Sequence, residues 1–444
     1  KKEKKFLNLL KKIYFIFWPL IFSLTIVSLS RVFRKNNFNL SENKNILIDI
    51  FVTSNNLTTN RFYNNLEKKL KVKKNIYFVP TIVNVNIFKL PSLITKIRNN
   101  KNFILKEDFI NFTDILFAFN YLFRKKKFYI NYENYKGWNL DNLIKEEFSK
   151  YSNFQAILIS LQNYCFAKNL KKRNVKLKKV IDWFENTTVD KGWNFGFRKF
   201  FPETLTVGYQ SYTLYRQFMC KHPSNSEYLH KVIPQKIVVI GKAYKKARKE
   251  FCKKIKIDVG PALRFSHVFL QKFNYKRKYN ILVSLNLDLI ESKKILSSVI
   301  DTKYAASGKK IFIKSHPLLS LSKIIDKKNI PENFVELEGD FYDIAKNSRI
   351  IISAGISSSI VESFAYGCAI VMPYMNKNDY YNFKYLKIPK SSYKICKDIY
   401  ELDREINHFL NEKAKDTRKR IKKSILLRPK LFQKTTNNNL KIFS

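Results

Sequence analysis

The sequence predicts an α/β protein of two doubly wound, Rossmann-like domains behind a basic and apolar N-terminal helix. Two observations predict the domains: short β-branched runs alternate with helical segments along the 444 residues, and small or polar residues follow several of these runs. Alternation of strand and helix favours a largely parallel sheet with helices on its faces. At roughly 150 residues per domain, the length fits two or three domains.

The N-terminal helix is predicted at residues 1–35. An uncharged run of 18 residues, 13–30, lies between basic residues on both sides, and Pro19 interrupts it. This length is at the short end for a bilayer span. Three interpretations remain open: an interfacial or re-entrant membrane anchor, a spanning helix, and a buried helix of the first domain. In the first two, the flanking Lys and Arg would bind anionic lipid headgroups.

The first domain is predicted at residues 36–233, where apolar runs and helical periodicity alternate. Its strands are expected at 45–53, 75–83, 180–185 and 205–209. Its helices are expected at 61–70, 103–123, 154–170 and 190–201. This order of strand, helix and strand predicts a parallel sheet.

The second domain is predicted at residues 234–400, beginning near Pro234. Its strands are expected at 236–240, 279–285, 310–313, 334–337, 349–353 and 369–373. Its helices are expected at 243–254, 289–300, 342–347 and 358–366. Residues 401–444 are basic and helical, and we expect them to pack back across the domains. Ligands of such sheets bind outside the carboxyl ends of the strands, here in the cleft between the halves.

The composition excludes several classes of protein. A chain with 45% hydrophobic residues can form large cores, which excludes global disorder. Five cysteines without a CxxC pair argue against a disulfide framework or a zinc ribbon. The net charge of +49 has three explanations: AT-rich codons, an anionic membrane surface, or a nucleic acid. Proteins that bind the phosphates and bases of nucleic acids usually favour Arg. This chain has 68 Lys and 16 Arg, so we favour the explanation by AT-rich codons.

A basic cluster follows the strand at 310–313. Lys314, Ser315, His316 and Pro317 place a cation and a histidine at the mouth of the predicted sheet. A nucleoside mono- or diphosphate fits this position, because both groups can contact phosphate oxygens. The structural alternative is a histidine in an ordinary turn.

A serine-rich turn lies between the strand at 349–353 and the next helix. Small residues such as Gly355 let the backbone approach a phosphate, and the N–H groups at the helix start point toward it. The hydroxyls of Ser357, Ser358 and Ser359 add donors. A simple helix cap requires only one serine, so the three together favour phosphate binding.

Two carboxylates have candidate roles beside these clusters. Glu362, one helical turn beyond the serines, is a ribose ligand or a partner in the helix cap. Glu185 ends the strand at 180–185 and is a general base for an acceptor hydroxyl, or a charged loop residue. Tyr209 and Gln210 end the next strand, where they are candidates to hold an acceptor or donor sugar.

These residues carry a resemblance to a known family. The His-Pro turn and the stretch SAGISSSIVESFAYGCAIVMP (353–373) resemble bacterial surface-polysaccharide glycosyltransferases of the GT-B fold. The two motifs are similar to those of sialyltransferases, Kdo transferases and polyol-phosphate polymerases, which use CMP- or CDP-linked donors. The stretch 185–210 looks like the central region of surface-carbohydrate biosynthesis proteins.

The resemblance implies roles for individual residues. His316 and the three serines would bind the nucleotide phosphate, with Lys314 and Pro317 beside them, and Glu362 would bind the ribose. Glu185 is our candidate for the base, by its position at a strand end rather than by a motif. The sequence contains no Asp-x-Asp metal motif, so we expect neither a metal ion nor another cofactor.

The function implied is transfer of a sugar from a CMP-, CDP- or UDP-linked donor to a growing surface glycan, such as capsule, O-antigen or lipopolysaccharide. The acceptor would be a glycan or a lipid-linked glycan, at the inner face of the cytoplasmic membrane. Two alternatives stay open: a sugar-nucleotide epimerase of similar fold, and a basic nucleic-acid-binding protein. No RNA- or DNA-reading motif supports the second alternative, so we expect no nucleic-acid partner.

Overall fold

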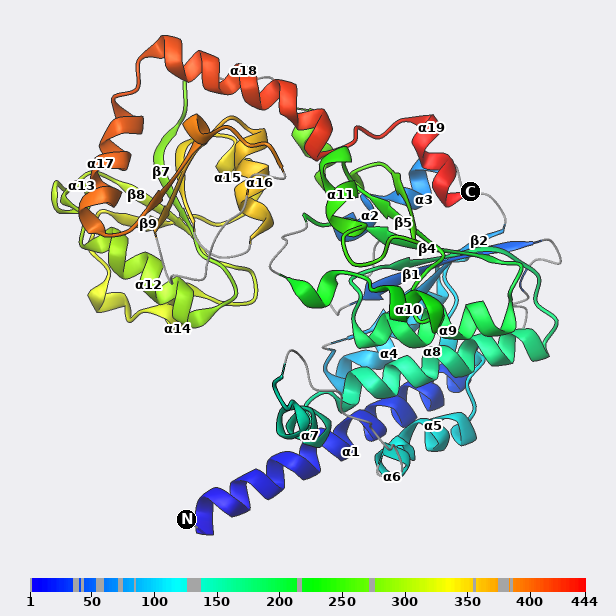
Figure 1. The fold of residues 1–444 in the computed structure, drawn as a ribbon. Helices are drawn as coiled ribbons and strands as arrows, with labels where there is room; N and C mark the ends of the chain where they lie inside the picture. The colour runs from blue at the N-terminus through cyan, green and yellow to red at the C-terminus, as the bar shows by residue number, and fades with distance from the viewer. Residues whose placement is uncertain are drawn as a thin grey trace.

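A computed structural model describes residues 2–34, 40, 44–52, 60–70, 75–83, 85–125, 137–213, 218–270, 276–353, 357–373, 383 and 386–444. These residues form two six-stranded sheets, with helices packed on their faces (Figure 1). All strand pairs within both sheets are parallel. The architecture confirms the prediction of two doubly wound domains behind an apolar N-terminal helix.

The N-terminal domain is built on a sheet with the strand order β2-β1-β3-β4-β5-β6. The strands are β1 (Asn45–Val52), β2 (Ile76–Ile82), β3 (Leu177–Trp183), β4 (Leu205–Gln210), β5 (Lys236–Val239) and β6 (Lys256–Val259). Burial is nearly continuous along β1 and β2, because both faces of a parallel sheet are covered. The β-branched runs of the sequence therefore mark buried strands correctly.

The helices predicted at 154–170 and 190–201 are confirmed, whereas those predicted at 61–70 and 103–123 are each divided into shorter helices. The helices of this domain are α1 (Lys2–Val32), α2 (Asn60–Tyr63), α3 (Leu66–Lys69), α4 (Leu90–Arg98), α5 (Phe112–Phe119), α6 (Tyr121–Arg124), α7 (Asp141–Ser149), α8 (Phe154–Lys172), α9 (Thr188–Phe200), α10 (Asn225–Leu229) and α11 (Lys245–Arg248). The long helical segment expected at 103–123 is wrong in its first part, because Phe103 pairs with Phe78 beside β2. Helix α8 is confirmed and packs along α9, where Gly192 sits against the backbone of Ser160.

The C-terminal domain has a sheet with the strand order β12-β11-β10-β7-β8-β9. The strands are β7 (Tyr279–Ser284), β8 (Ile311–Lys314), β9 (Phe334–Glu336), β10 (Ser348–Ile352), β11 (Ala369–Pro373) and β12 (Tyr393–Cys396). The helices are α12 (Leu289–Ile300), α13 (Lys303–Ala306), α14 (Leu321–Ile324), α15 (Phe341–Ala345), α16 (Ser358–Ala365) and α17 (Ile399–Leu410). Strand β12 was not predicted, since its four residues contain a lysine and lie outside any long apolar run.

The sheet topology corrects the domain boundary predicted near Pro234. Strands β5 and β6 extend the first sheet beyond β4, so the boundary lies between β6 and β7. The Thr206 amide donates to Gln235 Oε1 at 2.9 Å, and the Gln235 amide donates to Thr206 Oγ1 at 3.0 Å. These two bonds hold the start of β5 beside β4, at the position where the sequence predicted the domain boundary.

The end of the chain returns to the N-terminal domain. Helix α18 (Ala414–Leu431) runs from one domain to the other, and α19 (Asn437–Leu440) lies on the N-terminal domain (Figure 1). The Gln433 amide donates to the Ile240 carbonyl at 2.6 Å. Lys179 Nζ donates to the carbonyl oxygens of Ile442 and Ser444, each at 2.9 Å. Two chain segments therefore connect the domains.

Candidate functional site

Side chains of both domains line a cleft with a volume of about 870 Å³. This volume lies in the range of ligand pockets, roughly 300–1,000 Å³. The C-terminal domain contributes the end of β8 and the starts of α15 and α16, and the N-terminal domain contributes Asn64 and the 3₁₀ helix η6 (Leu263–Phe269). The cleft brings together these residues of the predicted donor site: Lys314, Ser315, His316, Pro317, Ser357, Ser358, Ser359 and Glu362.

The basic cluster begins at Lys314, the last residue of β8, and continues in the turn that follows. Lys314 Nζ donates to the Leu337 carbonyl at 3.3 Å, which holds the ammonium beside the neighbouring strand. The Leu318 amide donates to His316 Nδ1 at 3.2 Å. Because Nδ1 accepts this bond, the proton of a neutral His316 ring is on Nε2. Both side chains line the cleft, where they can donate to an anion.

The serine turn forms the start of α16. Ser357 is the N-cap residue, and its hydroxyl accepts from the Ser359 amide at 3.3 Å. The Ser357 and Ser359 hydroxyls lie 2.7 Å apart. The positive end of the helix dipole and the three hydroxyls therefore face the same cleft as the basic cluster. Gly355 lies outside the described residues.

Glu362 lies one turn further along α16 and is mostly buried. His267 Nε2 of η6 lies 3.5 Å from Glu362 Oε2, within ion-pair range but without hydrogen-bond geometry. The His267 ring stacks on Tyr342, with ring centroids 4.5 Å apart and planes 24° apart. A residue of the N-terminal domain thus contacts the predicted ribose ligand of the C-terminal domain.

Arg264, Ser266 and His267 line the cleft and were missed by the sequence analysis. They lie in residues 255–278, a segment without clear periodicity that gave no element to place them on. The signal was present in part, because the strand-like run that forms β6 ends just before them at Gly260. Recognition of β6 as a strand would have placed these residues at a strand end.

Glu185 does not line this cleft. Its Oε1 accepts from Trp183 Nε1 at 3.0 Å, and its Oε2 accepts from Lys221 Nζ at 2.8 Å. Both carboxylate oxygens are thus engaged by groups of its own domain. Glu185 therefore lies outside the described lining of the donor cleft, and its role as a base stays a prediction.

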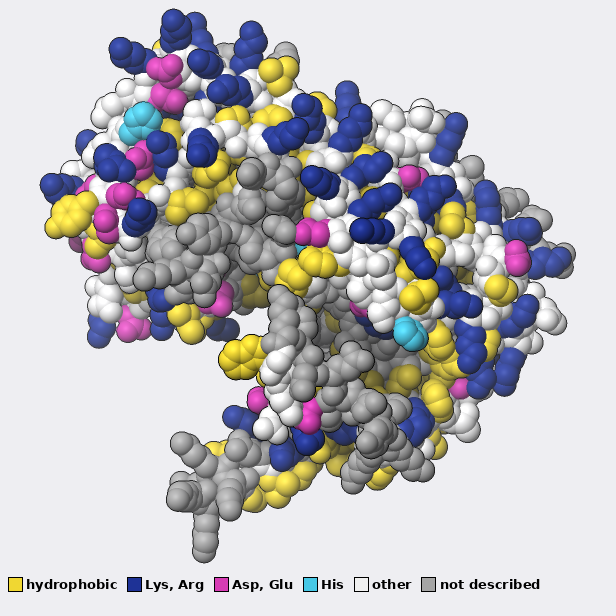
Figure 2. All heavy atoms as spheres, viewed as in Figure 1, with side chains coloured by type: hydrophobic (Ala, Val, Ile, Leu, Met, Phe, Trp, Pro, Cys, Tyr) yellow, Lys and Arg dark blue, Asp and Glu magenta, His cyan; other side chains and the backbone are white. Residues whose placement is uncertain are grey.

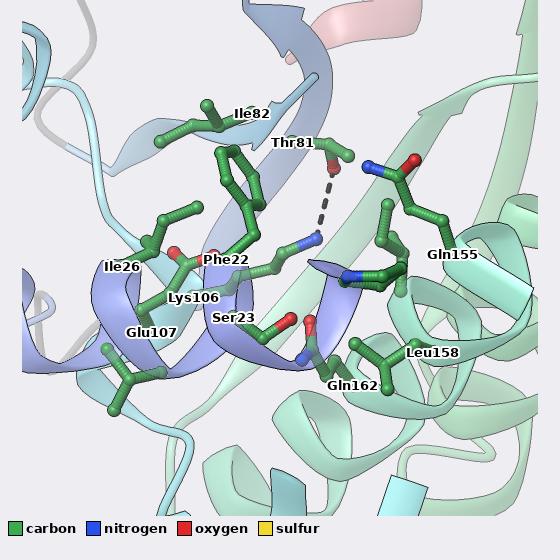
Figure 3. A pocket seen from close by; sticks show the side chains of 13 residues that line it. Phe22, Ser23, Ile26, Thr81, Ile82, Lys106, Glu107, Gln155, Leu158 and Gln162 are labelled. Carbon is green, nitrogen blue, oxygen red and sulfur yellow. Dashed lines mark hydrogen bonds between the residues drawn. The ribbon is translucent and has the colours of Figure 1, made fainter. Parts of the chain in front are cut away.

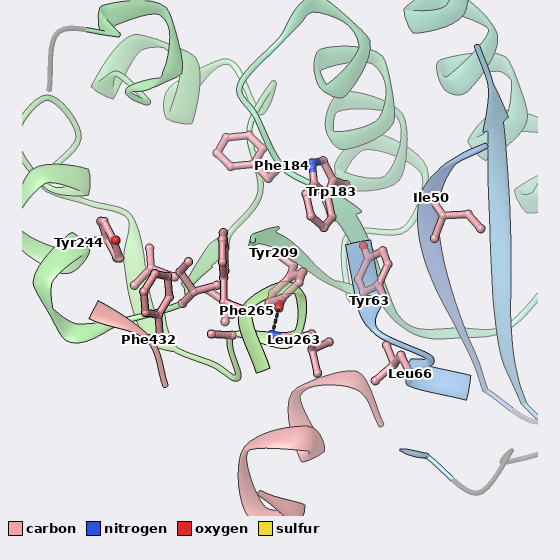
Figure 4. Packing of buried hydrophobic residues seen from close by; sticks show 14 of the residues in the cluster. Ile50, Tyr63, Leu66, Trp183, Phe184, Tyr209, Tyr244, Leu263, Phe265 and Phe432 are labelled. Atoms are coloured by element: carbon pink, nitrogen blue, oxygen red, sulfur yellow. Dashed lines mark hydrogen bonds between the residues drawn. The ribbon is translucent and has the colours of Figure 1, made fainter. Parts of the chain in front are cut away.

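Tyr209 and Gln210 are buried in the N-terminal domain. Tyr209 packs among Trp183, Tyr63 and Phe265 (Figure 4), and its hydroxyl donates to the Pro261 carbonyl at 2.7 Å. Gln210 Oε1 accepts from Arg248 Nε at 2.5 Å. The prediction of sugar contact is corrected for both residues, because each is only 1% exposed.

No protein-family model matches this chain, and no curated protein matches its sequence. Solved structures do match. A glycosyltransferase from Rickettsia africae ESF-5 is similar over 90% of this chain and 98% of that chain, with a TM-score of 0.50 and 13% identity. Arabidopsis thaliana UGT89C1 is similar over 90% of this chain and 98% of that chain, with a TM-score of 0.51 and 8% identity. The chain has the GT-B fold.

A third GT-B likeness is the α,α-trehalose 6-phosphate synthase from Burkholderia multivorans, over 91% of this chain and 95% of that chain. Its TM-score is 0.50 and its identity is 8%. At these identities the likeness establishes the fold, and the cleft of this GT-B chain must be interpreted from its own residues.

Two buried carboxyl groups lie in the N-terminal sheet of this GT-B fold, Asp49 on β1 and Asp182 on β3, and a third, Asp190, lies at the start of α9. Thr81 Oγ1 donates to Asp49 Oδ1 at 2.9 Å, and Asn194 Nδ2 donates to Asp182 Oδ2 at 2.7 Å. Burial raises the pKa of Asp49 to about 6 and that of Asp190 to about 7. Burial, together with the charge of Asp190, raises the pKa of Asp182 well above its usual range. These groups therefore oppose folding when they are ionised.

We expect Asp182→Asn to flatten the pH dependence of stability. A carboxyl group with a raised pKa in the folded state stabilises the fold below pH ~4, and that stability is lost as the pH rises through the folded-state pKa. The wild type should therefore lose free energy of unfolding between pH 5 and pH 8, and the variant should lose roughly 1–3 kcal/mol less. Urea unfolding at both pH values measures this. The exposed Asp326→Asn is the control, and equal slopes for wild type and Asp182→Asn would contradict the expectation.

Proposed function

We propose that this chain is a glycosyltransferase that moves a sugar from a nucleotide-activated donor to a glycan acceptor. The observation that carries the proposal is the convergence of Lys314, His316 and the serine turn on one cleft between two Rossmann-like domains. Cations, a ring N–H and a helix N-terminus together form an environment for a nucleotide phosphate. The GT-B fold and the glycosyltransferases that share it support the same reaction class.

In this proposal the donor phosphate is the leaving group. Negative charge grows on the phosphate oxygens as the bond to the sugar breaks. Hydrogen-bond donors of the protein that are already in place stabilise that charge. Lys314 and His316 supply this stabilisation at the end of β8, and the start of α16 supplies it from the facing turn. We propose that the transfer needs no metal ion, because these groups occupy the position where a cation would act. Glu362 binds the ribose through the carboxylate oxygen that does not face His267.

We further propose that the donor is CMP-, CDP- or UDP-linked and that the acceptor is a surface glycan or its lipid-linked precursor. The His-Pro and serine motifs support the donor class, and the basic, apolar helix α1 supports work at the inner face of the cytoplasmic membrane. The surplus of Lys does not indicate a nucleic-acid partner. On the face drawn in Figure 2, the Lys and Arg side chains are spread over both domains and do not gather along one groove.

Nucleotide binding by the full chain tests the proposal. We expect calorimetric titration with UDP, CDP, CMP and GDP to show clear binding of one nucleotide, in the presence of excess EDTA. Lys314→Ala should weaken this binding at least about tenfold, because a charge-assisted phosphate contact contributes roughly 1.5–3 kcal/mol. The matched control is Lys310→Ala, an exposed lysine just before β8, which should bind as the wild type does.

Three results would overturn the proposal. The first is the absence of binding to all four nucleotides, and the second is equal weakening by the Lys310 and Lys314 variants. The third is interconversion of free nucleotide sugars without an acceptor, which would assign the cleft to a sugar-nucleotide epimerase instead. Binding that is lost in EDTA and restored by Mg²⁺ or Mn²⁺ would remove the metal-independent form of the mechanism.

A further inference from the structure

We propose that one face of the N-terminal domain binds the surface of an anionic phospholipid bilayer. This docking face consists of the first half of α1 (Lys2–Ile21) together with α5, α6 and α7. In this arrangement α1 lies in the plane of the membrane interface and does not cross the bilayer. The inference rests on the proposed membrane location and names the surface and the mode of binding.

The first half of α1 extends away from the body of the domain (Figure 1). Its exposed apolar side chains include Phe6, Leu10, Ile13, Tyr14 and Phe17, and Tyr14 is 56% exposed. Figure 2 shows apolar side chains along this helix, with basic side chains beside them. A solvated helix with this much aromatic and aliphatic surface is typical of a segment that partitions into a membrane interface.

The second half of α1 is fixed in the core of the domain. Phe22, Ser23 and Ile26 pack over Lys106 and Glu107 (Figure 3), and all five residues are buried. If this half entered the hydrocarbon, the buried Lys106 and Glu107 would be exposed to lipid, at a cost that no packing offsets.

Length supports the same conclusion. The segment Leu9–Val32 is long and apolar enough to span a bilayer, but a third of its most apolar stretch is buried inside the protein. The part of α1 whose described side chains are not buried, Phe6 to Trp18, is about 20 Å long at a rise of ~1.5 Å per residue, and the hydrocarbon core is about 30 Å thick. The free part is therefore too short to span and suits an in-plane position.

Helices α5, α6 and α7 continue the apolar surface beside α1. Leu116 and Phe123 are exposed on α5 and α6, and the Phe17 ring of α1 lies 6.1 Å from that of Phe119. A groove of about 200 Å³, lined by Leu122 and Phe148 among others, opens between α6, α7 and α8. Segments distant in the sequence thus bring exposed apolar side chains together beside α1.

The charges around the docking face suit anionic lipid. The sequence of the first half of α1, Lys2–Ile21, has five Lys against one Glu. Lys12 and Lys125 both lie over the Tyr151 ring, with their Nζ atoms 5.9 Å and 4.5 Å from its centre. Helix α7 itself carries Asp141, Glu146 and Glu147 against Lys145, and Lys150 just after it pairs with Glu147 and lies 3.9 Å from Glu146. Basic side chains beside an apolar face favour headgroups such as phosphatidylglycerol over a neutral surface.

Vesicle sedimentation of the full chain tests the docking face. We expect binding to vesicles of equal phosphatidylglycerol and phosphatidylcholine, and at least about tenfold weaker binding to pure phosphatidylcholine. Tyr14→Asp with Phe17→Asp, on α1, should weaken binding at least about tenfold, and so should Leu116→Asp with Phe123→Asp, on α5 and α6. The matched control is Ile290→Asp with Leu426→Asp, which changes two equally exposed apolar residues of α12 and α18.

Each outcome decides the proposal. Unchanged binding of the Leu116 and Phe123 double variant would overturn the composite face and leave α1 as the sole anchor. An equal loss of vesicle binding in the control variant would assign the effect to the added negative charge alone, and it would overturn the composite face as well. Light scattering without lipid should give a monomer, and a dimer that the α1 variant dissociates would assign the face to a second copy of the chain. Nucleotide titration of each variant should match the wild type, so failure of vesicle binding is distinguishable from failure of the proposed transfer function.

Discussion

Donor turnover is expected to fall by about 10²–10³-fold in kcat/KM when His316 is replaced by Ala. The ring lies at the end of β8 and lines the cleft opposite the start of α16. A hydrogen-bond donor that is held in place before the reaction stabilises charge on the leaving phosphate without reorganisation. In the alanine variant no other group replaces it. Release of nucleotide from the donor selected by the binding panel measures the effect.

His408→Ala is the matched control for this experiment. His408 is exposed on α17 and does not line the cleft, so its variant should retain wild-type turnover. The effect of His316→Ala should appear mainly in kcat, because the charge on the phosphate is greater in the transition state than in the ground state. Wild-type turnover in His316→Ala, or an equal loss in His408→Ala, would contradict the assigned role.

A second large effect is expected on stability, at the buried ion pair between Arg420 and Glu412. Arg420 Nη2 lies 2.7 Å from Glu412 Oε2, and both side chains are buried. Arg420 also donates to the Gly367 carbonyl just after α16. Arg420→Ala leaves the Glu412 carboxylate buried without this partner, which should lower the free energy of unfolding by about 3–5 kcal/mol. Urea unfolding measures this loss.

The neighbouring Lys419→Ala is the control, since Lys419 is exposed on the same helix. The double variant Arg420→Met with Glu412→Leu should recover most of the loss, because an apolar pair avoids the buried charge. A loss below 1 kcal/mol for Arg420→Ala, or no recovery in the double variant, would show that the pair contributes little.

The same ion pair has a pH dependence of defined sign. Burial opposes ionisation of Glu412, but the hydrogen bond and charge of Arg420 outweigh it, so the pKa of Glu412 is lowered. A carboxylate with a lowered pKa stabilises the fold above the pKa of the unfolded chain, and this stability is lost as the pH falls through the folded value. The difference between wild type and Arg420→Ala should therefore shrink toward pH 3.

Much of the fold was predictable because its strands are short, apolar and β-branched. Strand β1 and helix α12 occur almost where the periodicity placed them. Predictions failed where local sequence does not set the outcome. Nothing local distinguishes a strand that joins the first sheet from one that starts a second sheet, so β5 was assigned to the wrong domain.

The candidate site divides in the same way. The sequence by itself determined that Lys314, His316 and the serines follow strands, and in a parallel sheet the carboxyl ends of the strands share one edge. Only the tertiary structure decided that Glu185 pairs with Lys221, that Tyr209 is a core residue, and that the second half of α1 is held in the domain. The physical reason is that periodicity reports which residues lie on one face of an element, whereas partners and burial depend on contacts between segments far apart in the chain.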